Sequence, residues 1–200
     1  QPPARGTPLR GLVVAPRSFK WQMAMLRILG YQGLSMRDLE PYLDGRKQGK
    51  VVGITFDDGY LNNFEYALPI LSKYGHTATC YAVSSLIGKT NAWDEGVVIS
   101  KALMGLDHWL RWLDEGMDVG SHTQHHIDLR ETSDEEAWAE IKNSKYDLES
   151  LLDIDVRHFC YPYGRLNSTH VKMARQSGYL TATTMRRGRV WPESDLHDLP

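Results

Sequence analysis

The sequence has few cysteines, no long apolar run and no run of basic residues. Two cysteines cannot build a disulfide framework, and because Cys80 and Cys160 both lie in apolar, strand-like segments, we expect buried free thiols. No apolar stretch approaches the roughly 18 residues that span a membrane. The net charge of −2 is spread along the chain, and the missing basic run argues against a nucleic acid as the main partner.

A leader pattern is also missing from the visible start of the chain. The sequence begins at Gln1, and "QPPARGTP" lacks the charged and then apolar order of a signal peptide. It stops at "DLHDLP", before any clear closing element. With 200 residues and 42% hydrophobic content, the chain can bury one sizeable core. We therefore expect a single domain over residues 1–200, trimmed at one or both ends, and assign no oligomeric state.

Apolar, β-branched segments alternate with amphipathic ones after an extended entry segment at residues 1–16. Helices are expected at residues 16–31, 35–43, 63–75, 105–116, 133–152 and 168–179, and strands at residues 51–56, 77–83, 117–122, 157–164 and 180–185. Trp109 and Trp112 have the helical spacing of core residues.

Single helices between the strands, without hairpin turns, predict right-handed βαβ units and a parallel sheet. The expected fold class is therefore α/β, as a distorted barrel of parallel strands, complete or incomplete, with surrounding helices. An open doubly wound sheet is the alternative, since the order of segments does not say whether the first and last strands meet.

Polar residues follow three of the expected strands at their carboxyl ends, where parallel α/β folds carry catalytic groups. "VVGITF" runs into Asp57 and Asp58, "MDVGSH" into "HTQHH", and "HFC" into "YPYG". Taken alone, each of these three segments has an ordinary structural explanation: a solvated turn, histidines on the surface, or a proline–glycine turn. Three of them in order at one rim indicate a functional site.

The histidines indicate a metal. His122 and His126 are four residues apart, so in a helical turn they would lie on one face and could bind one divalent ion. One aspartate of the adjacent pair would be the third ligand, leaving positions open for water and substrate. The other aspartate would take a proton from the bound water. Zinc is the first choice of metal, and the same ligands accept cobalt, nickel or iron.

"TFDDG", "HTQHH" as an H-[ST]-x-x-H motif, and "YPYG" resemble the first three motifs of the polysaccharide deacetylases, also called carbohydrate esterase family four. The likeness runs in order from Val51 to Thr184, and "SFKWQMAMLRILGYQGLSMRDL" is similar to the lead-in helices of bacterial members. The resemblance implies one polysaccharide deacetylase domain with a distorted barrel fold. The localisation stays unassigned between the bacterial cytoplasm and the cell envelope. The "YPYG" form is similar to the branch that acts on exopolysaccharides, including poly-N-acetylglucosamine.

Carried over residue by residue, the resemblance implies that Asp57 is the general base and that Asp58, His122 and His126 are the metal ligands. It implies that Thr123 braces the histidine loop. His125 falls on a variable position of the motif and is not expected to be a ligand.

In the third motif, the resemblance implies that the backbone N–H of Tyr163 helps to hold the oxyanion, and that Tyr161 and Pro162 form one wall of the substrate groove. The residues of "TNAWDEG" suggest a further contact, in which Trp93 stacks on a sugar face and Asp94 binds a hydroxyl. The alternative for this segment is a capped surface loop with a packed tryptophan.

The chain departs from the family pattern at two places. Many members have an arginine in the third motif that contacts the base. Cys160 stands there in this chain, with Arg157 three residues earlier and with Arg186 or Arg187 as substitutes from the last strand. The late general-acid histidine corresponds to His197 in "LHDLP", a poor match, or to a residue beyond this chain.

The resulting hypothesis is a metal-dependent hydrolase that removes N-acetyl groups from amino sugars of a polysaccharide by attack of metal-activated water on the acetyl carbonyl. Its partner would be a polysaccharide or oligosaccharide containing N-acetylhexosamine. An O-deacetylase with the same machinery is one alternative. A non-catalytic carbohydrate-binding module on the same scaffold is the other; the missing arginine favours it, and the retained Asp57 opposes it.

Overall fold

The computed structural model describes residue 11 and residues 13–97 and 99–200. The α-helices are α1 (Pro16–Ile28), α2 (Met36–Leu43), α3 (Leu68–Tyr74), α4 (Leu106–Asp114), α5 (Asp134–Leu152) and α6 (Ser168–Gln176). The strands are β1 (Gln32–Leu34), β2 (Val51–Gly53), β3 (Thr55–Phe56), β4 (Thr79–Ala82), β5 (Asp118–Ser121), β6 (His158–Cys160) and β7 (Thr181–Thr183). Single helical turns lie at Asn63–Ala67, Ser84–Leu86, Ala92–Asp94, Leu129–Glu131 and Pro162–Gly164.

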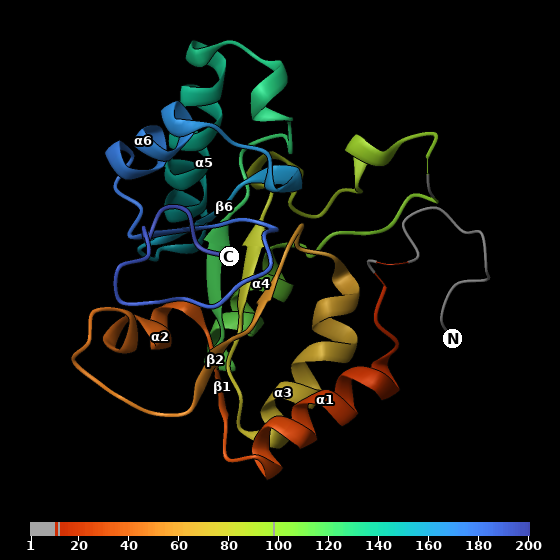
Figure 1. Cartoon of the computed structure of the whole chain (residues 1–200). Coiled ribbons are helices and arrows are strands. Elements are labelled where there is room, and N and C mark those ends of the chain that lie inside the picture. Colours follow the sequence, from red (N-terminus) through yellow and green to blue (C-terminus); the bar gives the residue numbers. More distant parts are fainter. Residues whose placement is uncertain (1–10, 12, 98) are drawn as a thin grey trace.

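Five parallel strands, β3 to β7, lie side by side in chain order and curl into a half-barrel with helices around it (Figure 1). A doubly wound sheet would reverse its strand order at a switch point, and the described strands do not. The barrel prediction is therefore confirmed over its open-sheet alternative. A separate parallel pair, β1 and β2, precedes the five strands.

The expected strand at residues 51–56 divides into two pieces. β2 pairs with β1, which the sequence did not predict, while β3 pairs with β4. Between them, the N–H of Ile54 donates to the carbonyl of Leu34, and the carbonyl of Ile54 accepts from the N–H of Thr79. The continuous apolar run "VVGITF" predicts one strand buried on both faces, and this prediction was wrong, because Gly53 is exposed.

The ends of the helices follow local capping. Ser35 and Ser133 begin α2 and α5, and each side chain accepts a hydrogen bond from the backbone N–H three residues on. The spacing of Leu29 predicts a place on the apolar face of the first helix, but α1 ends at Ile28 and Leu29 is exposed. The expected entry segment at residues 1–16 lies largely outside the described residues.

Apolar side chains cover both sides of the sheet. On the helical side, Trp109 and Trp112 of α4 are 1% and 0% exposed, as their spacing predicted. A second cluster joins Tyr81 of β4 and Cys160 of β6 to Leu39 of α2. Cys80 and Cys160 are both free and buried, as expected.

Helix α2 lies across the amino ends of the strands. The N–H of Met36 donates to Oγ1 of Thr79, the first residue of β4, and Glu40 pairs with Arg157 just before β6 at 3.1 Å. The carboxyl ends of the strands are therefore the end of the barrel where a site can form. Within the described part of the chain, no helix combines the length and apolarity needed to cross a membrane.

We expect Gly120→Ala to destabilise the fold by about 1–3 kcal/mol, because the added methyl group would overpack the core. A Cβ at this position in β5 would lie 2.3 Å from Cδ1 of Tyr81 and 2.9 Å from the carbonyl oxygen of His158. Urea unfolding measures the change. Gly11→Ala is the control, since its Cβ would meet nothing within 4 Å. Equal unfolding midpoints for the two variants would contradict this packing.

Candidate active site

Asp57 and Asp58 follow β3 at the carboxyl end of the barrel. Asp58 and Gly59 both have left-handed backbone, each with a φ of 73°, so the chain turns sharply directly after the strand. Asp57 lines a cavity of about 150 Å³ between the strands and α2, whereas Asp58 contacts two histidines of the next segment. The turn thus gives the two neighbouring carboxyl groups different surroundings.

The histidine loop, residues 122–126, follows β5 and is not the helical turn that we expected. Thr123 and His126 have φ values of 66° and 59°, in the left-handed region. Oγ1 of Thr123 donates to the carbonyl of His122 at 2.6 Å and accepts from the N–H of His126 at 3.0 Å. Thr123 therefore braces the loop as expected, and irregular backbone brings the two histidines together.

The side chains of Asp58, His122 and His126 converge on one point. Oδ1 of Asp58 lies 3.4 Å from Nε2 of His122 and 3.1 Å from Nε2 of His126, and the three ligand atoms are within 4.8 Å of one another. Nδ1 of His122 is 2.8 Å from the carbonyl of Cys160, and only a protonated nitrogen can donate to a carbonyl. Without a metal, a second proton on Nε2 lets His122 donate to Asp58. Without that proton, the lone pair of Nε2 faces a carboxylate oxygen and the two repel each other. A cation between them would remove this repulsion, so the donor set fits a divalent metal.

The two aspartates also differ in pKa. Burial alone would raise the pKa of Asp58, but hydrogen bonds from His122 and His126 outweigh it and hold that pKa well below its usual range. Asp57 is more accessible to solvent than Asp58, yet desolvation by the surrounding protein raises its pKa. A positive charge on His122 opposes this rise, and the negative charge of Asp58 adds to it. Burial lowers the pKa of His126, which favours the neutral form that binds metals. Neighbouring carboxyl groups whose pKa values are shifted in opposite directions are typical of sites where the two groups have different chemical roles.

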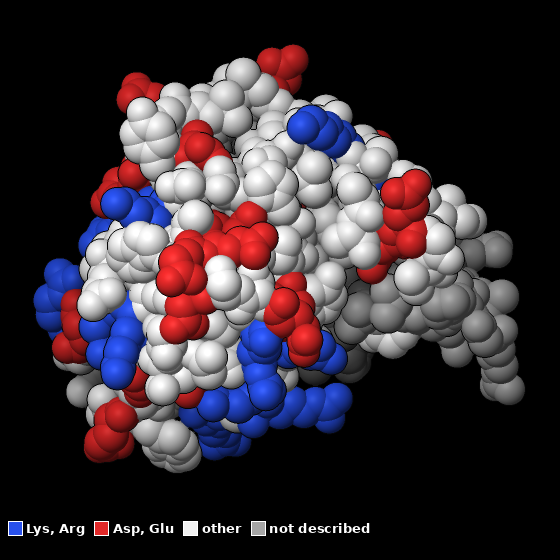
Figure 2. All heavy atoms as spheres, turned by 90° about the horizontal axis from the view of Figure 1, so that it is seen from above, with Lys and Arg blue, Asp and Glu red and all other residues white. Residues whose placement is uncertain are grey.

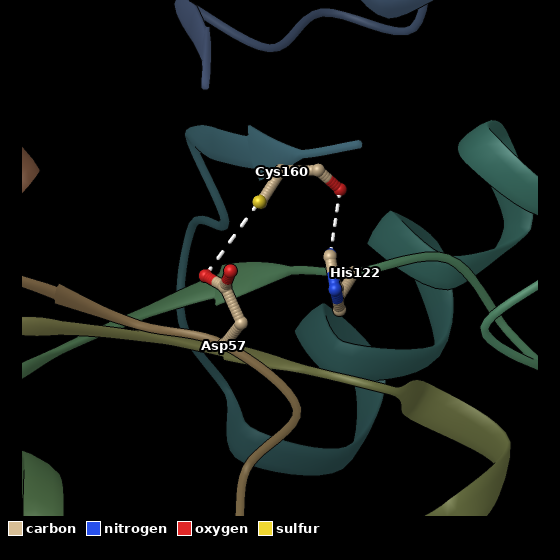
Figure 3. Close-up of side chains that lie close together, drawn as sticks. All are labelled: Asp57, His122 and Cys160. Atoms are coloured by element: carbon tan, nitrogen blue, oxygen red, sulfur yellow. Dashed lines mark hydrogen bonds between the residues drawn. The ribbon is translucent and has the colours of Figure 1, made fainter. Parts of the chain in front are cut away.

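Cys160 connects Asp57 to His122 (Figure 3). Its Sγ lies 3.6 Å from Oδ1 of Asp57, and its carbonyl accepts the hydrogen bond from His122. Arg157 pairs with Glu40 near the other end of the barrel, and Arg186 pairs with Asp198 at 2.6 Å. Within the described residues no arginine pairs with Asp57, so the thiol occupies the place of the expected cation.

For the deacetylase activity that the resemblance implies, we expect Cys160→Ala to keep acetate release within about tenfold of the parent rate, a barrier change of roughly 1.4 kcal/mol. Alanine loses the thiol contact with Asp57 but keeps the backbone carbonyl that orients His122. The steady-state rate on a substrate of the parent protein measures the effect. A loss of about 10³-fold or more, with the fold intact, would mean that the sulfur itself takes part in the reaction.

Two aromatic side chains hold the ring of His126. Trp93 stacks on it with ring centroids 4.3 Å apart and planes 25° apart, and Tyr163 meets it edge-on at 4.7 Å. One face of the Trp93 ring is therefore covered by a histidine. For that face, the structure agrees with the alternative in which the tryptophan packs against the protein and does not stack on a sugar. Asp94 accepts a hydrogen bond from the side chain of Asn91 at 3.2 Å.

Non-glycine residues with left-handed backbone concentrate at this site. Five occur in the described part of the chain, and four of them are Asp58, Thr123, His126 and Tyr163. Each such conformation costs about 1–3 kcal/mol and persists only where the surroundings enforce it. The clustering supports a functional role for this site, and it is independent of the motifs.

A second cavity, of about 590 Å³, opens beside His126. It is lined by His126, Ile127, Asp128, Glu131, Thr132, Glu136, Tyr163 and Arg165. Seen from the carboxyl ends of the strands, acidic side chains gather over the middle of the surface (Figure 2). Tyr161 and Pro162, which we expected in the groove wall, are buried, and the side chain that lines the cavity from this motif is Tyr163.

His197 lies apart from the cluster. Its Nε2 is 2.8 Å from the carbonyl of Tyr179, its Nδ1 is 3.7 Å from Asp195, and its own carbonyl accepts from the hydroxyl of Tyr161. Among the described residues, no hydrogen bond or ion pair connects His197 to the two aspartates or the two converging histidines. Its role as general acid stays a prediction.

Glu140 is a further residue at the site that the sequence pattern did not indicate. Glu140 of α5 accepts hydrogen bonds from the backbone N–H groups of Gln124 and His125, both at 2.9 Å. It lies among charged residues of an amphipathic helix, so pattern alone does not separate it from solvated neighbours. Its burial, at 6% exposure, is the distinguishing signal and is visible only in the structure.

Comparison with known proteins adds independent evidence. A model of the family described as polysaccharide deacetylase matches residues 44–182. The Bacillus subtilis protein YxkH, named as a polysaccharide deacetylase, is 28% identical over 190 residues, which are 94% of this chain and 64% of that protein. The poly-β-1,6-N-acetyl-D-glucosamine N-deacetylase of Staphylococcus epidermidis is 25% identical over 201 residues, covering 96% of this chain and 68% of the relative.

A solved structure shows the same architecture. The Streptococcus pyogenes deacetylase PplD in complex with acetate superposes with a TM-score of 0.81 and 26% identity, covering 98% of this chain and 85% of that one. The chain spans about two thirds of the two curated relatives, 64% and 68% of their lengths. The family model, the relatives and the fold agree, and the chain belongs to the polysaccharide deacetylase family.

Proposed function

We propose that this chain is a metal-dependent deacetylase that removes N-acetyl groups from amino sugars of a polysaccharide. The observation that carries the proposal is the convergence of Asp58, His122 and His126 beside a second carboxylate, Asp57. Two imidazoles and one carboxylate leave positions open on a metal, as catalysis requires.

In this proposal, Asp58, His122 and His126 hold one divalent ion, with Zn²⁺ as the first choice and Co²⁺, Ni²⁺ or Fe²⁺ as alternatives. When bound, the ion would polarise the acetyl carbonyl and lower the pKa of water. The carbonyl of Cys160 fixes the tautomer of His122, so that Nε2 is the free donor atom.

The other groups of the chain move protons and hold charge. Asp57, whose carboxylate lies within 4.8 Å of a ring nitrogen of His122 and also lines a cavity, takes the proton of the attacking water. The backbone N–H of Tyr163 donates to the oxyanion; among the described residues it has no other hydrogen-bond partner. A general acid then protonates the leaving amine, and His197 is the candidate in this chain.

Removal of an N-acetyl group is favoured over removal of an O-acetyl group by the relatives. One of them is named for N-deacetylation of poly-β-1,6-N-acetyl-D-glucosamine, and this supports the same class of polymer as substrate. The cavity of about 590 Å³ beside His126 is of the size that holds small ligands, and it would take a sugar of the chain. Trp93 and Asp94 border the metal ligand His126 and are candidates for contacts to the sugar.

The geometry of the site gives less support to the alternative, a non-catalytic binding module, than to a deacetylase. A module that only binds sugar has no use for a carboxylate such as Asp57, which lies in its own cavity beside the ligand cluster. The four left-handed residues of the site would likewise be a cost without benefit.

Acetate release from matched N-acetylated and O-acetylated glycan oligomers, with Zn²⁺ or Co²⁺ added, separates these functions. We expect acetate from β-1,6-linked N-acetylglucosamine oligomers and little from their O-acetylated counterparts. Faster release from the O-acetylated set would assign O-deacetylation. Binding of the oligomers with no acetate from either set would assign the binding module.

A further inference from the structure

One carboxylate outside the metal cluster holds the backbone of the histidine loop. Oε2 of Glu140 accepts hydrogen bonds from the N–H groups of Gln124 and His125, both at 2.9 Å, and Oε1 lies 2.6 Å from Nδ1 of His125. Glu140 is on α5, so the loop between two proposed ligands is tied to the longest helix of the fold.

The burial of Glu140 indicates that these contacts matter. The residue is only 6% exposed, and a buried carboxylate is tolerated where hydrogen bonds satisfy its oxygens. Three donors from two consecutive residues satisfy it here. Seven residues further along α5, Asp147 accepts from the side chain of Gln124 at 2.7 Å and from Ser84 at 2.9 Å. The loop is thus held against α5 at two points.

The segment that Glu140 holds is strained. The left-handed residues Thr123 and His126 flank Gln124 and His125, whose N–H groups Glu140 binds. Such a conformation needs external contacts to persist. If the loop relaxed, the imidazoles of His122 and His126 would no longer converge on Asp58, since the backbone between them sets their separation.

We propose that Glu140 is a positioning residue for the metal centre, acting through its hydrogen bonds to the two backbone N–H groups of the loop and not through its charge. This inference rests on the proposed function, because it assumes that His122 and His126 bind a metal. Removal of outer groups that orient ligands typically weakens metal affinity or activity by about 10- to 100-fold.

Variants at this position separate hydrogen bonding from charge. Glu140→Gln keeps an oxygen that can accept both backbone N–H groups, and its amide can donate to the other tautomer of His125. Glu140→Asp keeps the charge but is one methylene shorter, so its oxygens fall short of the loop. Glu140→Ala loses all three bonds. His125→Ala loses the side-chain bond alone, and Glu135→Gln, at an exposed position on the same helix, is the control for charge.

The measurement is a titration of each metal-free protein with Co²⁺, followed by the visible absorption that reports the coordination geometry, with circular dichroism to confirm that each protein is folded. We expect Glu140→Ala and Glu140→Asp to raise the Kd for Co²⁺ by about 10- to 100-fold and to change the absorption bands. We expect Glu140→Gln, His125→Ala and Glu135→Gln to bind Co²⁺ within about threefold of the parent, below the range expected for Glu140→Asp.

Parent-like Co²⁺ affinity in folded Glu140→Asp, or a Glu140→Gln protein as weak as Glu140→Asp, would overturn the inference. If Glu140→Ala does not fold, the comparison of Glu140→Gln with Glu140→Asp is sufficient to test the inference. A parent protein that binds no Co²⁺ would overturn the proposed function and this inference with it, whereas a parent that binds Co²⁺ while every variant matches it would overturn the inference only.

Discussion

Asp58→Asn is expected to lose the metal and the activity together, whereas Asp57→Asn is expected to keep the metal and lose at least about 10²-fold of the activity. The geometry separates the two acids. Oδ1 of Asp58 faces both imidazoles, so the uncharged amide of asparagine would weaken the ligand set directly. Asp57 contacts the thiol of Cys160 and lines a cavity, so its loss removes a proton acceptor and leaves the ligands in place.

Metal content by elemental analysis and acetate release, measured on the same preparations, test this division. The two variants are matched controls for each other, because both replace one carboxylate by an isosteric amide at adjacent positions. If Asp57→Asn emptied the site while Asp58→Asn retained the metal, the two assignments would have to be exchanged.

His126→Ala is expected to strip the metal and with it the activity, while His125→Ala, one residue away, keeps both. Nε2 of His126 lies 3.1 Å from Oδ1 of Asp58, and its ring is held between Trp93 and Tyr163. The ring of His125 points instead to Glu140, with Nδ1 2.6 Å from that carboxylate. A centre with two remaining protein ligands would not hold a divalent ion tightly.

Dialysis of both variants against equal concentrations of Zn²⁺, followed by metal analysis, gives the answer. Full occupancy in a folded His126→Ala protein would refute the ligand assignment. Loss of the metal from His125→Ala together with retention in His126→Ala would move the ligand by one residue.

Much of the site was predictable from the sequence, because its residues directly follow the carboxyl ends of strands. In a parallel sheet the carboxyl ends lie at one edge, so Asp58 after β3 and His122 after β5 were expected at the same rim once the alternation of strands and helices was recognised. Handedness did not decide the strand order, because right-handed βαβ units build both barrels and doubly wound sheets; the order β3-β4-β5-β6-β7 comes from the structure.

The remaining features depend on backbone detail that no residue pattern encodes. A spacing of four residues suggested a helical turn for His122 and His126, yet left-handed backbone at Thr123 and His126 brings them together. β1 has only three residues, too few to show a period, and its pairing with β2 divides the expected first strand.

The contacts of Cys160 were equally hidden. The sequence indicated a neutral residue in place of an arginine and predicted that it packs in the core. The structure buries it, as expected, but also puts its sulfur beside Asp57 and its carbonyl on His122. A backbone carbonyl is available at every position, so its use as the partner of a histidine leaves no trace in the residue type.

Acetate release from β-1,6-linked N-acetylglucosamine oligomers, before and after removal of metal by a chelator and after its return, tests the central claim most directly. We expect release by the metal-loaded protein, loss of that release on chelation, and recovery when Zn²⁺ or Co²⁺ is added in a one-to-one ratio. Release that persists undiminished in protein shown to be free of metal would contradict the claim that Asp58, His122 and His126 form a catalytic metal centre.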